Sequence, residues 1–293
     1  MNLRNVALTL LSLVAFGLNS ILCRLALAGH QIDPASFTFI RLTSGAMMLA
    51  ILSCFLRRKS PIGQGSWLSG FLLFSYAVAF SFAYVNLTAG TGGLILFGMV
   101  QFTMIGVGIA RGERPSTPEW LGLVVAQLGL VILVFPGLHA PSLFGATLMM
   151  IAGVSWGLYC LRGKLAKDPT LATADNFLRA VPFAALVGLG GLHTAHIGSS
   201  GVALALVSGA VTSGIGYVIW YTVLPHFTAT RAAIAQLAVP ALVAIMGVLV
   251  LSEHVDIRFG IASVLMLGGV SLAILTKGKA VVRPDAEPRL TRS

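Results

Sequence analysis

The sequence predicts an all-α integral membrane protein, in which ten transmembrane helices form two five-helix inverted repeats around a central cavity. Three observations predict this fold class: the composition, the length of the apolar stretches and an internal repeat. Hydrophobic residues make up 57% of the 293 residues and charged residues only 10%, whereas an ordinary soluble domain carries roughly 25% charged residues. The polar surface that this composition supplies is too small to cover a water-soluble globule.

The apolar residues run in long stretches, each sufficient for a helix to cross about 30 Å of hydrocarbon at roughly 1.5 Å per residue. They do not alternate with polar residues as porin strands require. The first stretch is predicted to be a retained helix and not a cleaved signal peptide, because its apolar core is longer than the usual run of about 7–15 residues. The ten predicted spans are 5–27, 34–56, 66–87, 90–110, 118–135, 143–162, 176–193, 202–223, 231–252 and 258–276.

Lysine and arginine residues gather on one side of the predicted spans. The net charge of +10 is therefore explained by residues that set the orientation of the spans in the membrane. No nucleic-acid partner is predicted. By the positive-inside rule the crowded side is cytoplasmic, so both termini of this multi-pass protein are predicted in the cytoplasm and the bilayer is predicted to be a bacterial inner membrane. The other side has only Arg24, Arg41 and Arg258 near span ends. The crowded side has Arg4, Arg57, Arg58, Lys59, Arg111, Arg114, Arg162, Lys164, Lys167, Arg179, Arg231 and the basic tail.

One register relates the two halves of the chain. Glu113 matches Glu253, and Phe16-Gly17 matches Trp156-Gly157, each pair 140 residues apart. Because each half contains five spans, an odd number, the second half enters the membrane in the opposite orientation, which is the construction of many secondary transporters. The predicted units are a first five-helix repeat at 1–137, a second at 138–276, and a basic cytoplasmic tail at 277–293 that is predicted to be disordered.

Several motifs resemble the drug/metabolite transporter superfamily in its ten-helix EamA-type form. They are the aromatic-glycine pair in the first helix of each repeat, Arg41 near the start of the second helix, and the glutamate that closes the fourth, at Gly112-Glu113 and Ser252-Glu253. The resemblance covers nearly the whole chain and is closest to YddG-type aromatic amino-acid exporters. It implies a secondary transporter that moves a small organic solute by alternating access.

The resemblance also implies contacts between the solute and the first helix of each repeat, at Trp156 and Asn19. The sequence departs from the family in two places: Phe16 stands where the family often has tryptophan, and Tyr159 stands where Asn19 has its match. Any stacking role is therefore expected to be weaker at Phe16, and Tyr159 becomes a further candidate contact.

Two helices present aromatic residues on one face at three- and four-residue spacing. An aromatic solute would stack on these two walls, and the hydroxyl groups would orient its polar end. The alternative for Tyr84 and Tyr221, which lie near span ends, is a place in the lipid or in the interfacial belts. The residues are Tyr76, Phe80 and Tyr84 on the third helix, and Ser213, Tyr217, Trp220 and Tyr221 on the eighth.

Uncharged polar residues lie at mid-membrane depth in the predicted spans. Gln101 and Gln236 are on the fourth and ninth helices, which line the path in the family, and with Asn19 and Ser213 they are candidates for binding the solute. Hydrogen bonds between helices are the alternative role for each of them.

Three residues are candidates for bending helices during gating. Pro240 removes one backbone hydrogen bond and is predicted to bend the ninth helix in its middle. Gly214 and Gly216 would let the eighth helix bend around the cavity. Tight packing between helices is the alternative role for the two glycines.

The expected function is export of aromatic and other neutral amino acids by a single chain. The predicted partners are that solute and membrane lipid, with no cofactor and no metal. The alternatives are a multidrug or other metabolite exporter and, more remotely, a multi-span membrane enzyme. No enzyme is predicted, because His193-x-x-His196 lacks a third ligand and neither an HExxH nor a P-loop motif occurs. No Lys/Arg pair is evident at mid-membrane depth to meet a phosphate.

Overall fold

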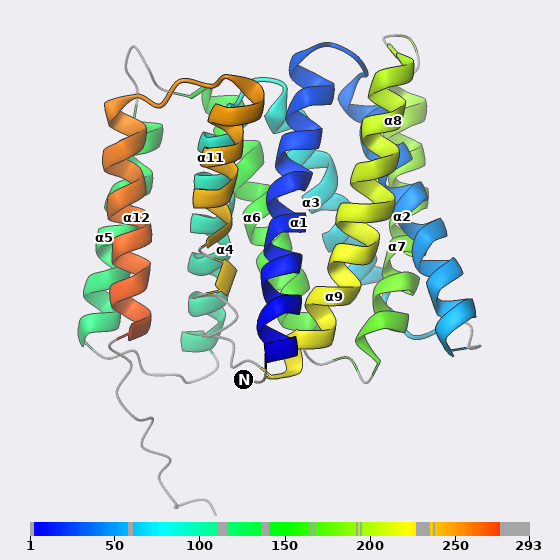
Figure 1. Cartoon of the computed structure of the whole chain (residues 1–293), viewed down its shortest axis with the longest axis horizontal. Helices are drawn as coiled ribbons and strands as arrows, with labels where there is room; N and C mark the ends of the chain where they lie inside the picture. The colour runs from blue at the N-terminus through cyan, green and yellow to red at the C-terminus, as the bar shows by residue number, and fades with distance from the viewer. Residues whose placement is uncertain are drawn as a thin grey trace, which may run out of the picture.

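The computed structural model describes residues 3–57, 61–110, 117–135, 141–163, 166, 168–191, 193, 195–226, 235–236 and 238–275. The basic tail at 277–293 and Glu113 lie outside these residues. The described residues form a bundle of helices (Figure 1), in which α1 begins and α12 ends at the same end, called here the terminal end, opposite the far end. The helices are α1 (Leu3–Ala28), α2 (Pro34–Arg57), α3 (Trp67–Tyr84), α4 (Ala89–Ala110), α5 (Thr117–Val134), α6 (Leu143–Gly163), α7 (Pro169–Gly190), α8 (Ser199–Val207), the π-helix η2 (Ser208–Ile215), α9 (Gly216–Val223), the 3-10 turn η3 (Leu224–His226), α11 (Ala238–Leu251) and α12 (Ile257–Leu275).

The number of membrane passes agrees with the prediction. α7 crosses the bundle although Asp175, Asn176 and Arg179 make its first turns polar. With the apolar helices it brings the described passes to ten, and the predicted all-α membrane fold is confirmed. Within the described ranges, six helices are long and apolar enough to span, at Leu3–Ala28, Pro34–Phe55, Trp67–Tyr84, Ala89–Ala110, Leu143–Gly163 and Ser199–His226. Three shorter apolar helices lie at Trp120–Leu133, Ala238–Leu251 and Ile257–Gly269.

The two halves interlock and do not simply stand side by side. α3, the third helix of the first half, packs against α6, the first helix of the second half. In the same way, the pass made by α8, η2 and α9 packs against α1. Equivalent helices also pair with each other, α2 with α7, α4 with α11 and α5 with α12. This exchange of partners places the centre of the bundle at the contact between the two repeats.

An ion pair joins the two halves at the far end. Arg24 of α1 donates hydrogen bonds to the backbone carbonyl oxygens of Tyr84 and Val85, at 2.8 and 3.1 Å. Its Nε lies 3.6 Å from Oε1 of Glu253. Glu253 accepts a hydrogen bond of 2.8 Å from the backbone N–H of Ala89, so its negative charge lies at the N-terminus of α4, where the helix dipole favours it.

A second polar contact joins the halves at the terminal end. Asp175 of α7 accepts hydrogen bonds from the backbone N–H groups of Gly63 and Gly65, at 3.0 and 2.7 Å. Arg179 donates to the same carboxylate at 3.1 Å, and Arg162 of α6 donates to the Ser69 hydroxyl at 2.9 Å. Both ends of the bundle are therefore held across the contact between the repeats.

The eighth pass contains the π-helix η2, whose turns are wider than α-helical turns. Segments of this kind are frequent at functional sites. A Cβ atom added to Gly209 would overlap the backbone carbonyl oxygen of Arg41 and the hydroxyl of Ser44. At Gly214 and Gly216 an added Cβ would have its closest neighbour at 3.3 and 3.0 Å. Gly209, and not Gly214 or Gly216, is therefore the glycine that lets η2 touch the backbone of α2.

We predict that Gly209→Ala destabilises the protein by about 1–3 kcal/mol, the usual range for an overpacked contact. The backbones of η2 and α2 must separate to admit the methyl group. Gly106→Ala is the matched control, because a Cβ there would meet nothing within 4 Å. Thermal unfolding of the two detergent-solubilised variants compares them, and equal melting temperatures would contradict the close contact.

Candidate functional site

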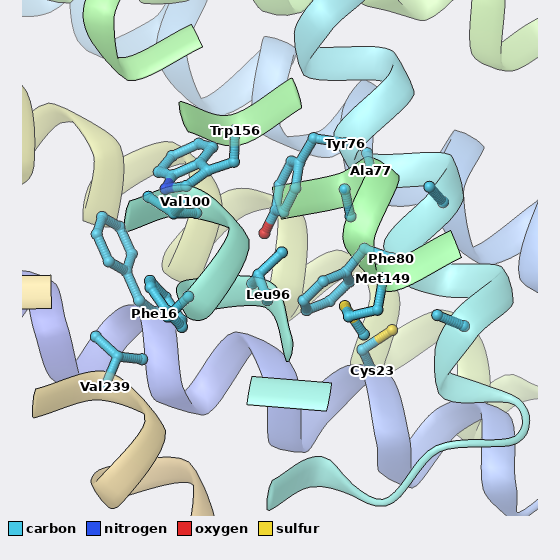
Figure 2. Close-up of a cluster of buried hydrophobic side chains, with 14 of the residues drawn as sticks. Phe16, Cys23, Tyr76, Ala77, Phe80, Leu96, Val100, Met149, Trp156 and Val239 are labelled. Atoms are coloured by element: carbon cyan, nitrogen blue, oxygen red, sulfur yellow. The ribbon is translucent and has the colours of Figure 1, made fainter. Parts of the chain in front are cut away.

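An aromatic cluster lies where the two repeats meet, with Trp156 of α6 at its centre. The centroid of its ring system lies 4.8 Å from that of Tyr217, 5.0 Å from that of Tyr76 and 5.7 Å from that of Phe16. Figure 2 shows Trp156 beside Tyr76, with Phe80 on the other side of Tyr76. Trp156 is 3% exposed, and its Nε1 donates a hydrogen bond of 3.1 Å to Oε1 of Gln236. The cluster thus joins α1, α3, α6, α9 and residue 236.

The four-residue spacing on α3 produces the first predicted wall. Tyr76 and Phe80 lie 5.3 Å apart, and Phe80 and Tyr84 4.7 Å apart, between ring centroids. Tyr84 is fully buried, and its hydroxyl donates to the backbone carbonyl of Ala89 at 3.3 Å. Its alternative placement in the lipid or the interfacial belt is therefore wrong.

The second predicted wall comes from α9. Trp220 lies 5.7 Å from Phe16, and Tyr221 lies 6.0 Å from Tyr159, between ring centroids. Tyr221 is buried as well, so an interfacial position is wrong for it too. Because Phe16 contacts both Trp156 and Trp220, the two walls are parts of one continuous cluster.

Asn19 organises the polar side of the cluster. Its Oδ1 accepts hydrogen bonds from the hydroxyls of Ser208 and Thr212, at 2.6 and 3.2 Å. Its Nδ2 donates to the Tyr76 hydroxyl at 3.4 Å. Both hydroxyl donors belong to η2, so the π-helix positions the amide of a residue on the opposite repeat.

Arg41 is the polar residue of the centre that sequence reasoning missed. Sequence analysis counted it among charges near span ends, whereas the structure buries it to 1% exposure. Its Nε donates to Ser213 and its Nη2 to Tyr76, each at 3.2 Å. The guanidinium lies over the rings of Tyr76 and Phe80, 5.3 and 5.1 Å from their centroids. The available signal was position: Arg41 lies about two turns inside an apolar helix, where a charge is by default a functional candidate.

Two of the predicted residues lie apart from this cluster. Gln101 and Pro240 line a separate small cavity between α4, α5, α11 and α12. Pro240 is the third residue of α11 and not the middle of a described helix, and Leu237 lies outside the described residues, so the predicted bend stays a prediction. Gln236 does reach the cluster, through the Trp156 indole. Among the predicted contacts, therefore, only Gln101 is not brought to the centre.

The centre is closed in this conformation. The enclosed space there is about 10 Å³, which is room for about one water molecule. An amino acid does not fit without movement of the surrounding helices. The lining residues are Phe16, Asn19, Ser20, Tyr76, Phe80, Leu96, Phe97, Trp156 and Tyr217.

Larger cavities open on either side of the closed centre. One of about 360 Å³ at the far end is lined by Thr88, Glu253 and Phe259, among others. Another of about 230 Å³ at the terminal end is lined by Ser66, Tyr159 and Arg162, among others. Tyr159 also lies 5.7 Å from Trp156 between ring centroids. It therefore separates the terminal cavity from the aromatic centre.

One run among the described residues has the spacing of a hydrolase motif. The run 153–157 reads Gly-Val-Ser-Trp-Gly, the spacing of a hydrolase nucleophile elbow, but it lies inside α6 and not at a strand-to-helix turn. Ser155 donates to the Ser75 hydroxyl at 3.1 Å. In the described ranges, no group of three or more His, Cys, Asp or Glu residues is placed to hold a metal.

We predict that Tyr76→Phe destabilises the protein by about 1–3 kcal/mol, because it removes the oxygen that accepts from both Asn19 and the charged Arg41. Tyr84→Phe is the matched control, since it deletes a buried hydroxyl whose partners, the Ala89 backbone carbonyl and the Ser20 hydroxyl, are both neutral. Chemical or thermal unfolding measures both. A smaller loss for Tyr76→Phe than for Tyr84→Phe would contradict the role given to the Tyr76 hydroxyl.

Comparisons with known proteins agree with this architecture. The model of the EamA-like transporter family matches residues 3–135 and again 143–275. An uncharacterized protein of Pseudomonas aeruginosa is 47% identical, over 97% of this chain and 99% of that protein. A protein of Escherichia coli named a probable amino-acid metabolite efflux pump is 24% identical, over 94% of this chain and 96% of its own length.

A solved crystal structure with 20% sequence identity superposes with a TM-score of 0.62 and covers 90% of this chain and 96% of that chain. At this identity the likeness shows the fold alone. The two matches to the family model and the relative at 47% identity show more. They show that the chain belongs to the EamA-like transporter family, whose name indicates a membrane transporter.

Proposed function

We propose that this protein exports aromatic and other neutral amino acids across a bacterial inner membrane by alternating access. The observation that carries the proposal is the closed aromatic centre, which contains neutral hydrogen-bonding groups and lies between two cavities, one at each end of the bundle. A solute site at the contact between inverted repeats is the arrangement that alternating access uses.

The chemistry of the centre supports an aromatic solute with a polar end. Trp156 and Tyr217 offer ring faces and edges, which favour stacked or edge-to-face contacts with a substrate ring. Asn19 and Tyr76 lie beside them with an amide and a hydroxyl for the polar end. The name of the Escherichia coli relative, an amino-acid metabolite efflux pump, points to the same substrate class and to outward transport.

The polar contacts at the two ends support the alternating mechanism. Opening toward the far end requires the contacts of Glu253 with Arg24 and Ala89 to part. Opening toward the terminal end requires the contacts of Asp175 with Gly63 and Gly65 to part. The contacts at each end join opposite repeats. If the contacts at one end break while those at the other end hold, the centre is exposed to one side only. A single chain contains both repeats, so the monomer is the proposed transporting unit.

The glycines of the eighth pass and Pro240 are proposed to serve this movement. Gly214 lies in the π-helix and Gly216 begins α9, so both adjoin the segment that holds Asn19. Pro240 packs in the first turn of α11, against Gly93 of α4. We infer that rotation of these helices opens space around Trp156.

We predict that Trp156→Leu raises the half-saturation concentration for phenylalanine by up to about tenfold, because one stacking contact is lost. Trp120→Leu on the outer face of α5, where Trp120 is 51% exposed, should leave transport unchanged. The measurement is uptake of labelled phenylalanine, threonine and a lipophilic drug cation into liposomes containing the purified protein, with and without a pH gradient.

Saturable flux of the amino acids supports the proposal, and dependence on the pH gradient would identify coupled transport. Flux of the cation without the amino acids would instead assign the protein to multidrug export. Absence of saturable phenylalanine and threonine flux would overturn the proposed substrate class.

A further inference from the structure

Arg41 places a permanent positive charge in the centre of the bundle, and no carboxylate among the described residues forms an ion pair with it. The guanidinium group stays protonated in proteins, and buried charges are normally paired. The two ion pairs found among the described residues use Glu253 with Arg24 and Asp175 with Arg179. Neither carboxylate contacts Arg41.

The groups that do contact Arg41 leave part of its binding capacity unused. Nε and Nη2 donate to the neutral hydroxyl oxygens of Ser213 and Tyr76. Nη1, which carries two further N–H groups, has no hydrogen-bond partner among the described residues. Neutral hydroxyls and aromatic rings offset the charge only partly, because the cost of burying an ion is of the order of several kcal/mol.

The position of the guanidinium is fixed by its surroundings. The hydrogen bonds from Nε and Nη2 hold one edge of the guanidinium group. The rings of Tyr76 and Phe80 pack against its face. Gly209 brings η2 against the backbone of Arg41 itself. Tyr76 and Phe80 also line the closed central space. A small displacement of these two rings would therefore connect the guanidinium with that space.

We propose that Arg41 binds the carboxylate of the transported solute, with Nη1 as the donor that the solute engages. This rests on the proposed function and narrows it: the solute is an amino or carboxylic acid with an apolar or aromatic side group, and organic cations are repelled. A carboxylate carries one negative charge, which the single charge of the guanidinium balances, whereas a phosphate carries more charge than one arginine offsets. The electron-rich faces of Trp156 and Tyr217 are suited to a substrate ammonium group nearby.

The test compares analogues that differ only in the group Arg41 would bind. Binding of phenylalanine, phenylalaninamide, phenethylamine and 3-phenylpropionate to the purified wild-type protein is measured by thermal shift and by competition against labelled phenylalanine. The same acid and amide pair is made with leucine. We expect the acids to bind roughly 10- to 100-fold more tightly than the compounds that lack a carboxylate, the range for a lost hydrogen bond to a charged group.

Variants then assign that preference to Arg41. Arg41→Gln should abolish the preference for phenylalanine over phenylalaninamide, and Arg41→Lys should restore part of it, because lysine keeps the charge without the planar fork. Arg258→Gln, at an arginine that donates to backbone carbonyls of Ile132 and Phe135, should keep the full preference. If Arg41→Gln does not fold, Arg41→Lys decides the role of Arg41: a reduced preference supports it, and an unchanged preference overturns it.

The outcomes separate this inference from the proposed function. Equal binding of acids, amides and the amine, or an unchanged preference in Arg41→Gln, would overturn the role of Arg41 while leaving an aromatic carrier in place. Preference for leucine over leucinamide without binding of any phenyl compound would keep the carboxylate site and remove the aromatic substrate class. Binding of none of the compounds would overturn both.

Discussion

The packing of Trp156 between the two repeats is the contact on which the centre of this transporter depends. One indole touches rings from α1, α3 and α9 and hydrogen-bonds to Gln236, so elements from both repeats meet at a single side chain. Interiors transmit strain because they are close-packed. Any movement that makes room for a solute beside Trp156 must therefore displace helices of both halves, which is the coupling that alternating access requires.

The polar groups around this contact must each find a hydrogen-bond partner. In hydrocarbon, buried polar groups need partners, and η2 supplies them: its wide turns carry Ser208 and Thr212 to Asn19 and Ser213 to Arg41. Gly209 permits the backbone approach that makes these distances possible. The π-helix η2, Gly209 and Arg41 thus form one unit. Its cation, which has no ion-pair partner among the described residues, is the group suited to binding an anion.

Sequence reasoning predicted the fold and several of the residues that meet in the aromatic centre, for identifiable reasons. Bilayer thickness fixes the length of a span, and the 140-residue register reveals the two repeats. Helix geometry places Tyr76, Phe80 and Tyr84 on one face. The π-helix was not predictable, because its extra residue per turn leaves no mark in hydropathy. The sequence places Arg41 among the charges near span ends, because a linear sequence shows the distance to a span end but not depth within a bundle. Gln101 was assigned to the centre by its helix, whereas its position on that helix directs it toward α5 and α12.

The most direct test of the account is whether the centre opens to each side in turn. Ser20 lines the closed space, and Ser20→Cys, in a background without Cys23, Cys54 and Cys160, places one thiol there with little change in volume. Labelling by a membrane-impermeant thiol reagent is measured from each side of oriented vesicles. The account predicts slow labelling from both sides, with saturating phenylalanine protecting the thiol from both. Labelling from one side only, with or without phenylalanine, would contradict alternating access at this site.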